Sequence, residues 1–158
     1  MDIDYFNLLK IHVPQRKNMF SLEGIDGSGK STQLRNVANA LSGLGIESLS
    51  VASPSTGLIG EFVRNNMKRL FGWERNALFL MDFIHVLQEN SDPSKILLWD
   101  RYVDSGYVSN RDMTIDQAVE WLSILPDATK TFLLDIDPKL VVMNRSESAH
   151  DHSNDLIW

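Results

Sequence analysis

Hydrophobic residues along the chain follow two different patterns. Short apolar runs bounded by turn residues are typical of buried strands, and they occupy residues 18–24, 46–53, 95–102 and 129–137. Between these runs, apolar residues recur with helical spacing, at residues 31–45, 56–71, 73–90 and 114–125. Thr114 is expected to cap the last of these helices, and Gly72 to separate the second from the third. The chain therefore alternates strands with helices.

Alternating strands and helices predict an α/β domain with a mainly parallel, doubly wound sheet. The runs at 95–102 and 129–137 are expected to be buried parallel strands. In such a fold the ligand lies beyond the carboxyl ends of the strands. We therefore expect one crevice to contain the residues that follow the strands, namely Gly24, Ser53, Asp100 and Asp135.

The first strand is followed by the stretch GIDGSGKST. Its spacing, with a helix after it, is that of the phosphate-binding P-loop, in which glycines let backbone N–H groups surround an anion. Lys30 is expected to reach the β and γ phosphates of ATP, and Ser31 to place its hydroxyl on Mg²⁺. This stretch predicts a P-loop NTPase-type, three-layer α/β/α fold. The predicted ATP-binding residues are Gly24, Gly27, Ser28, Gly29, Lys30, Ser31 and Thr32.

A second polar pair follows the third apolar run. Asp100 comes after four apolar residues, which is how P-loop proteins present an acid toward magnesium, although any buried strand can end in an exposed aspartate. Asp135, after the fourth run, is the competing candidate. Arg101 beside Asp100 carries a guanidinium group suited to phosphate, and this neighbour favours Asp100.

Composition narrows the choice of partners. The 158 residues suit one domain, and the net charge of −6 argues against a broad nucleic-acid surface. The chain has no cysteine, which excludes disulfides and thiolate sites. We find no apolar run long enough for a membrane span and no signal core, so we expect a cytoplasmic protein that does not bind a membrane. The charge remains compatible with small nucleotides as the partners. His150 and His152 are expected to be solvated, not metal ligands.

Five segments in order resemble the landmarks of thymidylate kinases: residues 20–33, 53–64, 76–83, 100–106 and 132–138. The resemblance runs from about residue 18 to about residue 145. We therefore assign residues 18–158 to a thymidylate kinase-like domain and residues 1–17 to an N-terminal arm of unknown role. Family members continue into a longer lid and further elements, so the chain is expected to be truncated at its C-terminus.

The resemblance implies transfer of the γ-phosphoryl group of ATP to a deoxynucleoside 5′-monophosphate, dTMP by default, with Mg²⁺. It assigns catalysis to Lys30, Asp100, Arg101 and Arg145, the last as a lid arginine, and the metal to Ser31 and Asp100. In family terms the substrate residues are Asp26 for the sugar 3′-hydroxyl, Phe79 for the base, Arg101 for the phosphate, and Ser105 and Gly106. The resemblance also implies a homodimer, because family members commonly pair through helices of the domain, and the apolar faces of residues 56–90 are the candidate surface.

Alternative interpretations stay open for single residues and for the function. Phe79 is equally compatible with an ordinary core position, Asp26 with a turn, and Arg64 is expected to pair with a neighbouring carboxylate on a surface helix. Phe83 stands where the family has an arginine that contacts the base, and Ser53 where a charged residue is usual. A kinase for another or modified deoxynucleotide, or a nucleotide-binding protein with little turnover, fits these departures.

Overall fold

A computed structural model describes residues 13–109 and 113–141 of the chain. Its sheet has four strands in the order β2-β3-β1-β4, and every neighbouring pair is parallel. The strands are β1 (Met19–Glu23), β2 (Ser48–Ala52), β3 (Ile96–Asp100) and β4 (Lys130–Leu133). The predicted parallel sheet is confirmed, and all four strands lie within the predicted apolar runs.

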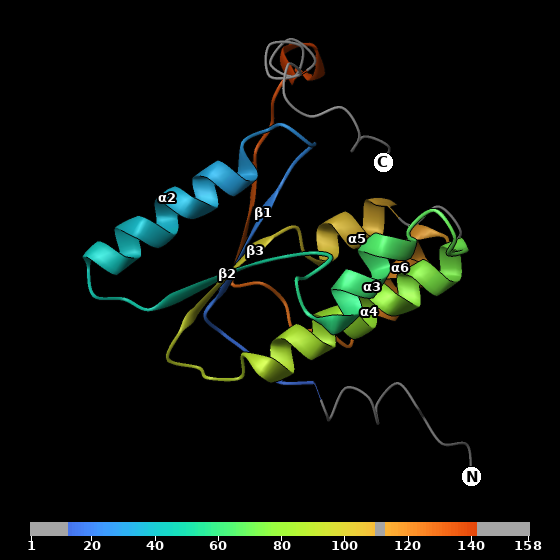
Figure 1. The fold of residues 1–158 in the computed structure, drawn as a ribbon, viewed down its shortest axis with the longest axis horizontal. Coiled ribbons are helices and arrows are strands. Elements are labelled where there is room, and N and C mark those ends of the chain that lie inside the picture. The colour runs from blue at the N-terminus through green and yellow to red at the C-terminus, as the bar shows by residue number, and fades with distance from the viewer. Residues whose placement is uncertain (1–12, 110–112, 142–158) are drawn as a thin grey trace.

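Helices cover both faces of this sheet (Figure 1). One face carries α2 (Lys30–Gly43), which follows β1. The other face carries α3 (Leu58–Asn66), α4 (Gly72–Glu89), α5 (Val103–Ser109) and α6 (Ile115–Leu122). The predicted three-layer α/β/α fold is confirmed.

Two apolar clusters explain why β1 and β3 are continuous apolar runs. Met19, Leu97 and Trp99 pack into the cluster that α4 and α6 share. Leu22 and Leu98 point to the opposite face, where they pack against Leu34 of α2. Because successive side chains of a strand alternate between faces, a strand that is covered on both faces needs apolar residues at consecutive positions.

Thr114 caps α6 as predicted, with its hydroxyl accepting a hydrogen bond from the N–H of Gln117. Gly72, however, begins α4 instead of separating two helices. The segment between Asn66 and Gly72 forms turns, and the backbone N–H of Phe71 is bound by the side chain of Glu74, three residues later. This side-chain contact fixes the start of α4.

In the C-terminal half one helix was missed and one expectation was wrong. Residues 103–109 form a helix, α5, that the pattern did not predict, because the segment is short and contains glycine and serine, which are weak helix formers. The last strand was expected to be buried over residues 129–137, but β4 ends at Leu133 and its four residues are exposed. Within the described residues β4 pairs only with β1, so one edge of it has no neighbour.

Residues 13–17, part of the N-terminal arm, contact the body of the protein. Val13 is buried in the larger apolar cluster. The guanidinium group of Arg16, itself buried, donates hydrogen bonds to the carbonyl oxygens of Asn90 and Lys95. Arg16 therefore ties this segment to the connection between α4 and β3. Residues 1–12 lie outside the described part of the chain.

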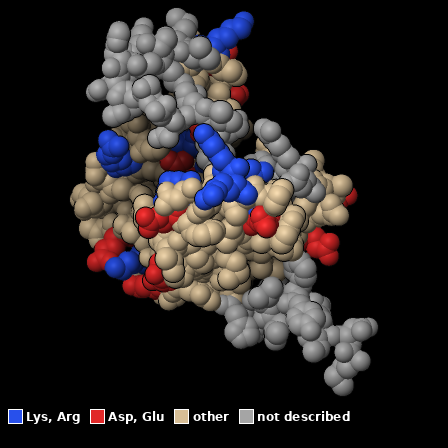
Figure 2. All heavy atoms as spheres, turned by 45° about the vertical axis from the view of Figure 1, so that its right-hand side comes forward, with Lys and Arg blue, Asp and Glu red and all other residues tan. Residues whose placement is uncertain are grey.

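Charged side chains of both signs are interspersed on the face that Figure 2 shows, among the described residues. In the described residues, no helix combines the length and the apolar character that a membrane span requires.

Candidate active site

The loop between β1 and α2 requires its glycines. Gly24, Gly27 and Gly29 have positive φ angles of 144°, 84° and 92°, a conformation that side chains disfavour. A Cβ at Gly24 would also lie 2.7 Å from the carbonyl oxygen of Leu134. Any other residue at position 24 would therefore force the loop or the backbone at Leu134 to shift.

The N-terminus of α2 lies at this loop. Gly29 precedes the helix and provides no side-chain cap, so the first N–H groups of α2 are left for an anion. Lys30, the first residue of α2, is buried, and its Nζ donates to the carbonyl oxygens of Gly24 and Ile25 at 3.0 and 2.9 Å. Burial lowers the pKa of Lys30, and nearby Arg101 lowers it further. The loop thus concentrates positive charge and N–H donors.

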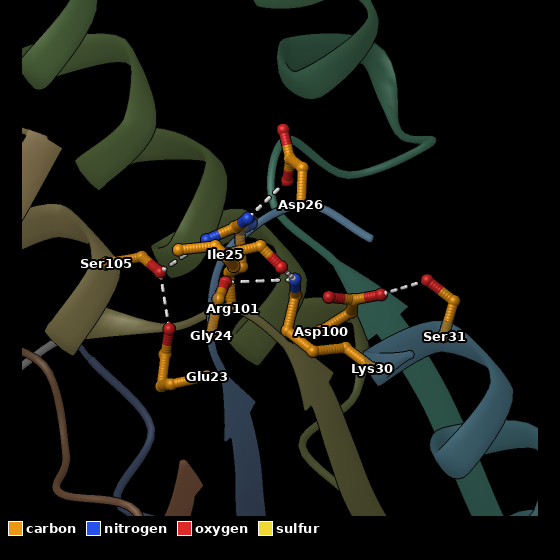
Figure 3. A network of polar contacts seen from close by, with 9 residues as sticks. All are labelled: Glu23, Gly24, Ile25, Asp26, Lys30, Ser31, Asp100, Arg101 and Ser105. Carbon is orange, nitrogen blue, oxygen red and sulfur yellow. Dashed lines mark hydrogen bonds and ion pairs between the residues drawn. The ribbon is translucent and has the colours of Figure 1, made fainter. Parts of the chain in front are cut away.

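Ser31 and Asp100 come together from different elements. The Ser31 Oγ, in the first turn of α2, donates a hydrogen bond of 2.5 Å to Oδ2 of Asp100, at the end of β3 (Figure 3). Hydroxyl and carboxyl oxygens are ligands that Mg²⁺ prefers, and Mg²⁺ commonly uses few protein ligands beside phosphate oxygens. The two side chains therefore fit a magnesium ion. In the part of the chain described, no group of three or more acidic or histidine side chains forms a separate metal site.

Arg101 is held in place by two contacts. Its guanidinium group forms an ion pair with Asp26 and donates to Ser105 Oγ at 3.2 Å (Figure 3). Its backbone has a φ of 69°, which is rare for a residue with a side chain and is often found at functional sites. The ion pair therefore joins the P-loop to the segment that follows β3.

Glu23 completes this network and was not predicted as a site residue. It is buried at the end of β1 and accepts hydrogen bonds from the Tyr102 backbone N–H, at 2.7 Å, and from the Ser105 hydroxyl. Burial raises the pKa of Glu23, and the two hydrogen bonds oppose part of that rise. The available sequence signal was an acid at the end of an apolar strand, the same signal that singled out Asp100.

Two cavities meet at this network. The smaller one, of about 500 Å³, is lined by the P-loop, the start of α2 and the ends of β2 and β3. The larger one, of about 660 Å³, extends between the P-loop, α4, α5, α6 and the segment after β4. Asp26, Ser53 and Arg101 line both cavities. These three residues form the wall where the two cavities join, which we call the shared wall.

The predicted site residues divide between the cavities. Those on the smaller cavity are Gly27, Gly29, Lys30, Ser31, Thr32 and Asp100. Those on the larger cavity are Gly24, Phe79, Ser105, Gly106 and Asp135, and the shared wall has Asp26 and Arg101. The Ser28 hydroxyl is buried beside Gly24 and lines neither cavity. Arg145, His150 and His152 lie outside the described residues.

Phe79, Phe83 and Arg64 were each given an interpretation from the sequence, and the structure shows their surroundings. Phe79 is half-buried, packs against the apolar core and also lines the larger cavity, so both of its interpretations fit its position. Phe83 belongs to the core, with its ring 5.4 Å from that of Trp99 and 5.1 Å from that of Tyr102. The expected ion pair of Arg64 was wrong: its guanidinium group donates to the backbone carbonyls of Pro54 and Ser55. Residues between β2 and α3 thus supply acceptors that a sequence pattern does not reveal.

Comparison with known proteins gives a consistent result. The sequence profile of the thymidylate kinase family matches residues 22–155. A thymidylate kinase of Chlorobium phaeobacteroides is 28% identical, over 81% of this chain and 65% of its own length. One from Thermoanaerobacter sp. is 30% identical, over 87% of this chain and 75% of its own. The chain thus spans just under two thirds of the first relative and three quarters of the second.

Solved structures agree with this assignment. The thymidylate kinase of Ehrlichia chaffeensis superposes with a TM-score of 0.68 at 25% identity, covering 86% of this chain and 82% of that one. That of Candida albicans has the same fold, with a TM-score of 0.65 at 22% identity, over 80% of this chain and 66% of that one. The resemblance noted in the sequence is confirmed: the chain belongs to the thymidylate kinase family.

Proposed function

We propose that the protein transfers the γ-phosphoryl group of ATP to a deoxynucleoside 5′-monophosphate, with dTMP as the default acceptor. The observation that carries this proposal is the shared wall, where a P-loop cavity and a second, larger cavity meet at Asp26, Ser53 and Arg101. A phosphoryl donor in one cavity and an acceptor in the other would bring the reacting groups together at this wall. Membership of the thymidylate kinase family supports the choice of reaction.

On the donor side, Lys30 and the N-terminus of α2 bind the phosphates of ATP. The ammonium group has three N–H donors, and two of them are given to loop carbonyls, which leaves the third for a phosphate oxygen. Ser31 and Asp100 hold Mg²⁺, which when bound neutralises charge on the phosphates. Arg145, in the segment after residue 141, is the proposed lid arginine.

On the acceptor side, Arg101 binds the monophosphate and Asp26 holds the sugar 3′-hydroxyl. Phe79 stacks on the base, beside Ser105 and Gly106. An oxygen of the acceptor phosphate attacks the γ-phosphorus, the bond to the β,γ-bridging oxygen breaks, and that oxygen leaves with the bonding pair on ADP. Because Arg101 is already fixed by Asp26 and Ser105, its guanidinium group needs little reorganisation to meet the phosphate.

We propose that the protein is cytoplasmic and forms a homodimer. The two copies would pair through α3 and α4. Large apolar side chains of these helices are exposed, including Leu58, Phe62, Trp73 and Met81. Pairing of two copies through these helices would remove these side chains from water. Sedimentation equilibrium of the wild type and of Phe62→Asp tests this: a wild-type dimer that dissociates in the variant supports it, and a wild-type monomer contradicts it.

The reaction is tested by coupled ADP release with ATP and Mg²⁺ against dTMP, dUMP, dCMP, dGMP, dAMP and 5-hydroxymethyl-dUMP. We expect turnover with dTMP that falls by at least about 100-fold in Lys30→Ala, since one preorganised charge contact is worth that much. If only another monophosphate is turned over, that nucleotide is the substrate in place of dTMP. Several bases are tested because Phe83, which lines the larger cavity, is apolar. ATP binding with no turnover on any acceptor contradicts the kinase and favours a nucleotide-binding protein.

A further inference from the structure

Asp82 is a fully buried acid on α4, a helix whose inner face is otherwise apolar. Both of its carboxyl oxygens accept hydrogen bonds from one residue, Ser55. The Ser55 backbone N–H donates to Oδ2 at 2.7 Å and the Ser55 hydroxyl donates to Oδ1 at 2.6 Å. Burial of a carboxyl group is unfavourable unless its oxygens are satisfied, so the contact with Ser55 is what allows an acid at this position.

Ser55 belongs to the segment of residues 53–57 between β2 and α3, and helix α3 holds the same segment from a second side. Arg64 of α3 donates to the carbonyl oxygens of Pro54 and Ser55. Gly60 of α3 packs so closely that an added Cβ would lie 2.2 Å from the Ser55 carbonyl oxygen. The Gly57 backbone N–H donates to Ser55 Oγ at 3.1 Å. Ser55 is therefore fixed between two helices that lie side by side on one face of the sheet (Figure 1).

The segment begins at the shared wall. Ser53, two residues before Ser55, lines both cavities, and its backbone N–H donates to the carbonyl oxygen of Asp100 at 3.2 Å. Helix α4 supplies another part of the larger cavity through Phe79 and Phe83, the first of which lies three residues before Asp82. Through Ser55, Asp82 thus connects α4, which carries the proposed base-binding residue, to Ser53 in the shared wall, where the phosphate is proposed to bind.

We propose that Asp82 is a positioning residue for the acceptor nucleotide. By binding Ser55, Asp82 makes residues 53–57 follow α4, so that Ser53 and the aromatic side chains of α4 keep a fixed separation. A monophosphate then meets a cavity whose two ends are already in register, and binding requires no ordering of the segment. This inference rests on the proposed function, because it assumes that the larger cavity takes the acceptor. Asp82 itself lines neither cavity.

The test measures binding of dTMP and of ATP by calorimetry to the full chain and to Asp82→Ala, Asp82→Asn and Ser55→Ala. We expect Asp82→Ala to weaken dTMP binding by about tenfold, the effect of losing hydrogen bonds to a buried acid, with ATP binding within about twofold of the wild type. Ser55→Ala keeps the backbone contact and should lose about threefold. Asp82→Asn should rescue binding, because an amide can accept from the Ser55 N–H and donate to the Ser55 hydroxyl.

The matched control is Ser21→Ala. Ser21 is a buried serine in β1 whose hydroxyl lies 2.8 Å from that of Thr131, and it lines neither cavity. Its variant should lower the melting temperature without changing dTMP binding. If Asp82→Ala does not fold, Ser55→Ala decides by the same comparison of dTMP with ATP.

Unchanged dTMP binding in Ser55→Ala and Asp82→Ala would overturn the inference and leave the proposed function standing. Equal weakening of dTMP and ATP would also overturn it, since that is the result of a general loss of folded protein. A wild type that binds ATP but no monophosphate would overturn the proposed function, and the inference with it.

Discussion

The Ser31 hydroxyl donates a 2.5 Å hydrogen bond to Oδ2 of Asp100, and this contact joins the first turn of α2 to the end of β3. Both side chains line the smaller cavity, next to the lysine of the P-loop. This contact supports the proposal that the two side chains, which come from elements far apart in the sequence, together hold a phosphate-bound magnesium ion.

Replacing Asp100 by Asn or Ser31 by Ala should raise the Mg²⁺ concentration needed for half-maximal ADP release by at least about tenfold, because the first removes the negative charge of the proposed site and the second its hydroxyl ligand. A magnesium titration at saturating ATP and dTMP measures this. Asp92→Asn is the control, since Asp92 is an exposed acid in the connection before β3, whose strand ends at Asp100. An unchanged magnesium dependence in both site variants would exclude these residues as ligands.

Replacing Phe79 can distinguish stacking on a base from ordinary packing in the core. If it stacks, Phe79→Ala should raise the KM for dTMP by about tenfold, because base–aromatic stacking is worth about 1–3 kcal/mol, and should leave the KM for ATP unchanged. Leu87→Ala provides the comparison, since Leu87 is fully buried in the same helix and lines neither cavity. That variant should chiefly lower the melting temperature. A Phe79→Ala variant with lowered stability and an unchanged KM for dTMP would make Phe79 a core residue.

The parts of the fold that were predicted are those with a local signal. The P-loop glycines have positive φ angles, and a glycine at a fixed spacing is visible in the sequence itself. Because the strands β1 and β3 are covered on both faces, they form apolar runs that are visible in the sequence. Helix α5 was missed because its few residues do not show a helical period.

The parts of the site that were not predicted depend on contacts between distant residues. Arg64 was assigned a carboxylate partner, as is usual on a surface helix, but its acceptors are the carbonyls of residues 54 and 55. Asp82 gave no signal, because its partner Ser55 is 27 positions away and brought near only by the packing of α4. Burial and partner are properties of the folded chain, and a spacing pattern does not contain them.

Substitution of Gly60 should lower the stability of the protein, and the same substitution at Gly43 is the control. A Cβ at Gly60 would lie 2.2 and 2.4 Å from the backbone oxygen and nitrogen of Ser55, so Gly60→Ala must displace α3 or the segment beneath it. We expect a loss of about 1–3 kcal/mol in the free energy of unfolding, the usual cost of overpacking. Gly43→Ala, in α2 with no atom within 4 Å of the added Cβ, should be neutral or stabilising by up to about 1 kcal/mol. Urea unfolding of both variants measures the difference, and equal stabilities would show that α3 adjusts freely.

Glu23 makes stability depend on pH in a direction that its burial fixes. Because burial raises the pKa of Glu23 above its usual value of 4.5, the folded state favours the protonated form. The resulting stabilisation is complete below the unfolded-state pKa and is lost as the pH rises through the raised folded-state pKa. Glu23→Gln mimics the protonated form: its amide oxygen can accept from the Tyr102 N–H, and its amide nitrogen can donate to the Ser105 hydroxyl oxygen, which in the wild type is the donor.

The melting temperature of Glu23→Gln relative to the wild type should therefore increase as the pH rises above the usual carboxyl pKa, because the wild type then has to ionise a buried acid. Glu61→Gln, at an exposed position of α3, gives the baseline for removing one negative charge from the surface. A wild type that gains stability over Glu23→Gln with rising pH would mean that the Ser105 and Tyr102 hydrogen bonds outweigh burial. In that case the folded protein favours ionised Glu23, which would add a negative charge to the wall of the larger cavity.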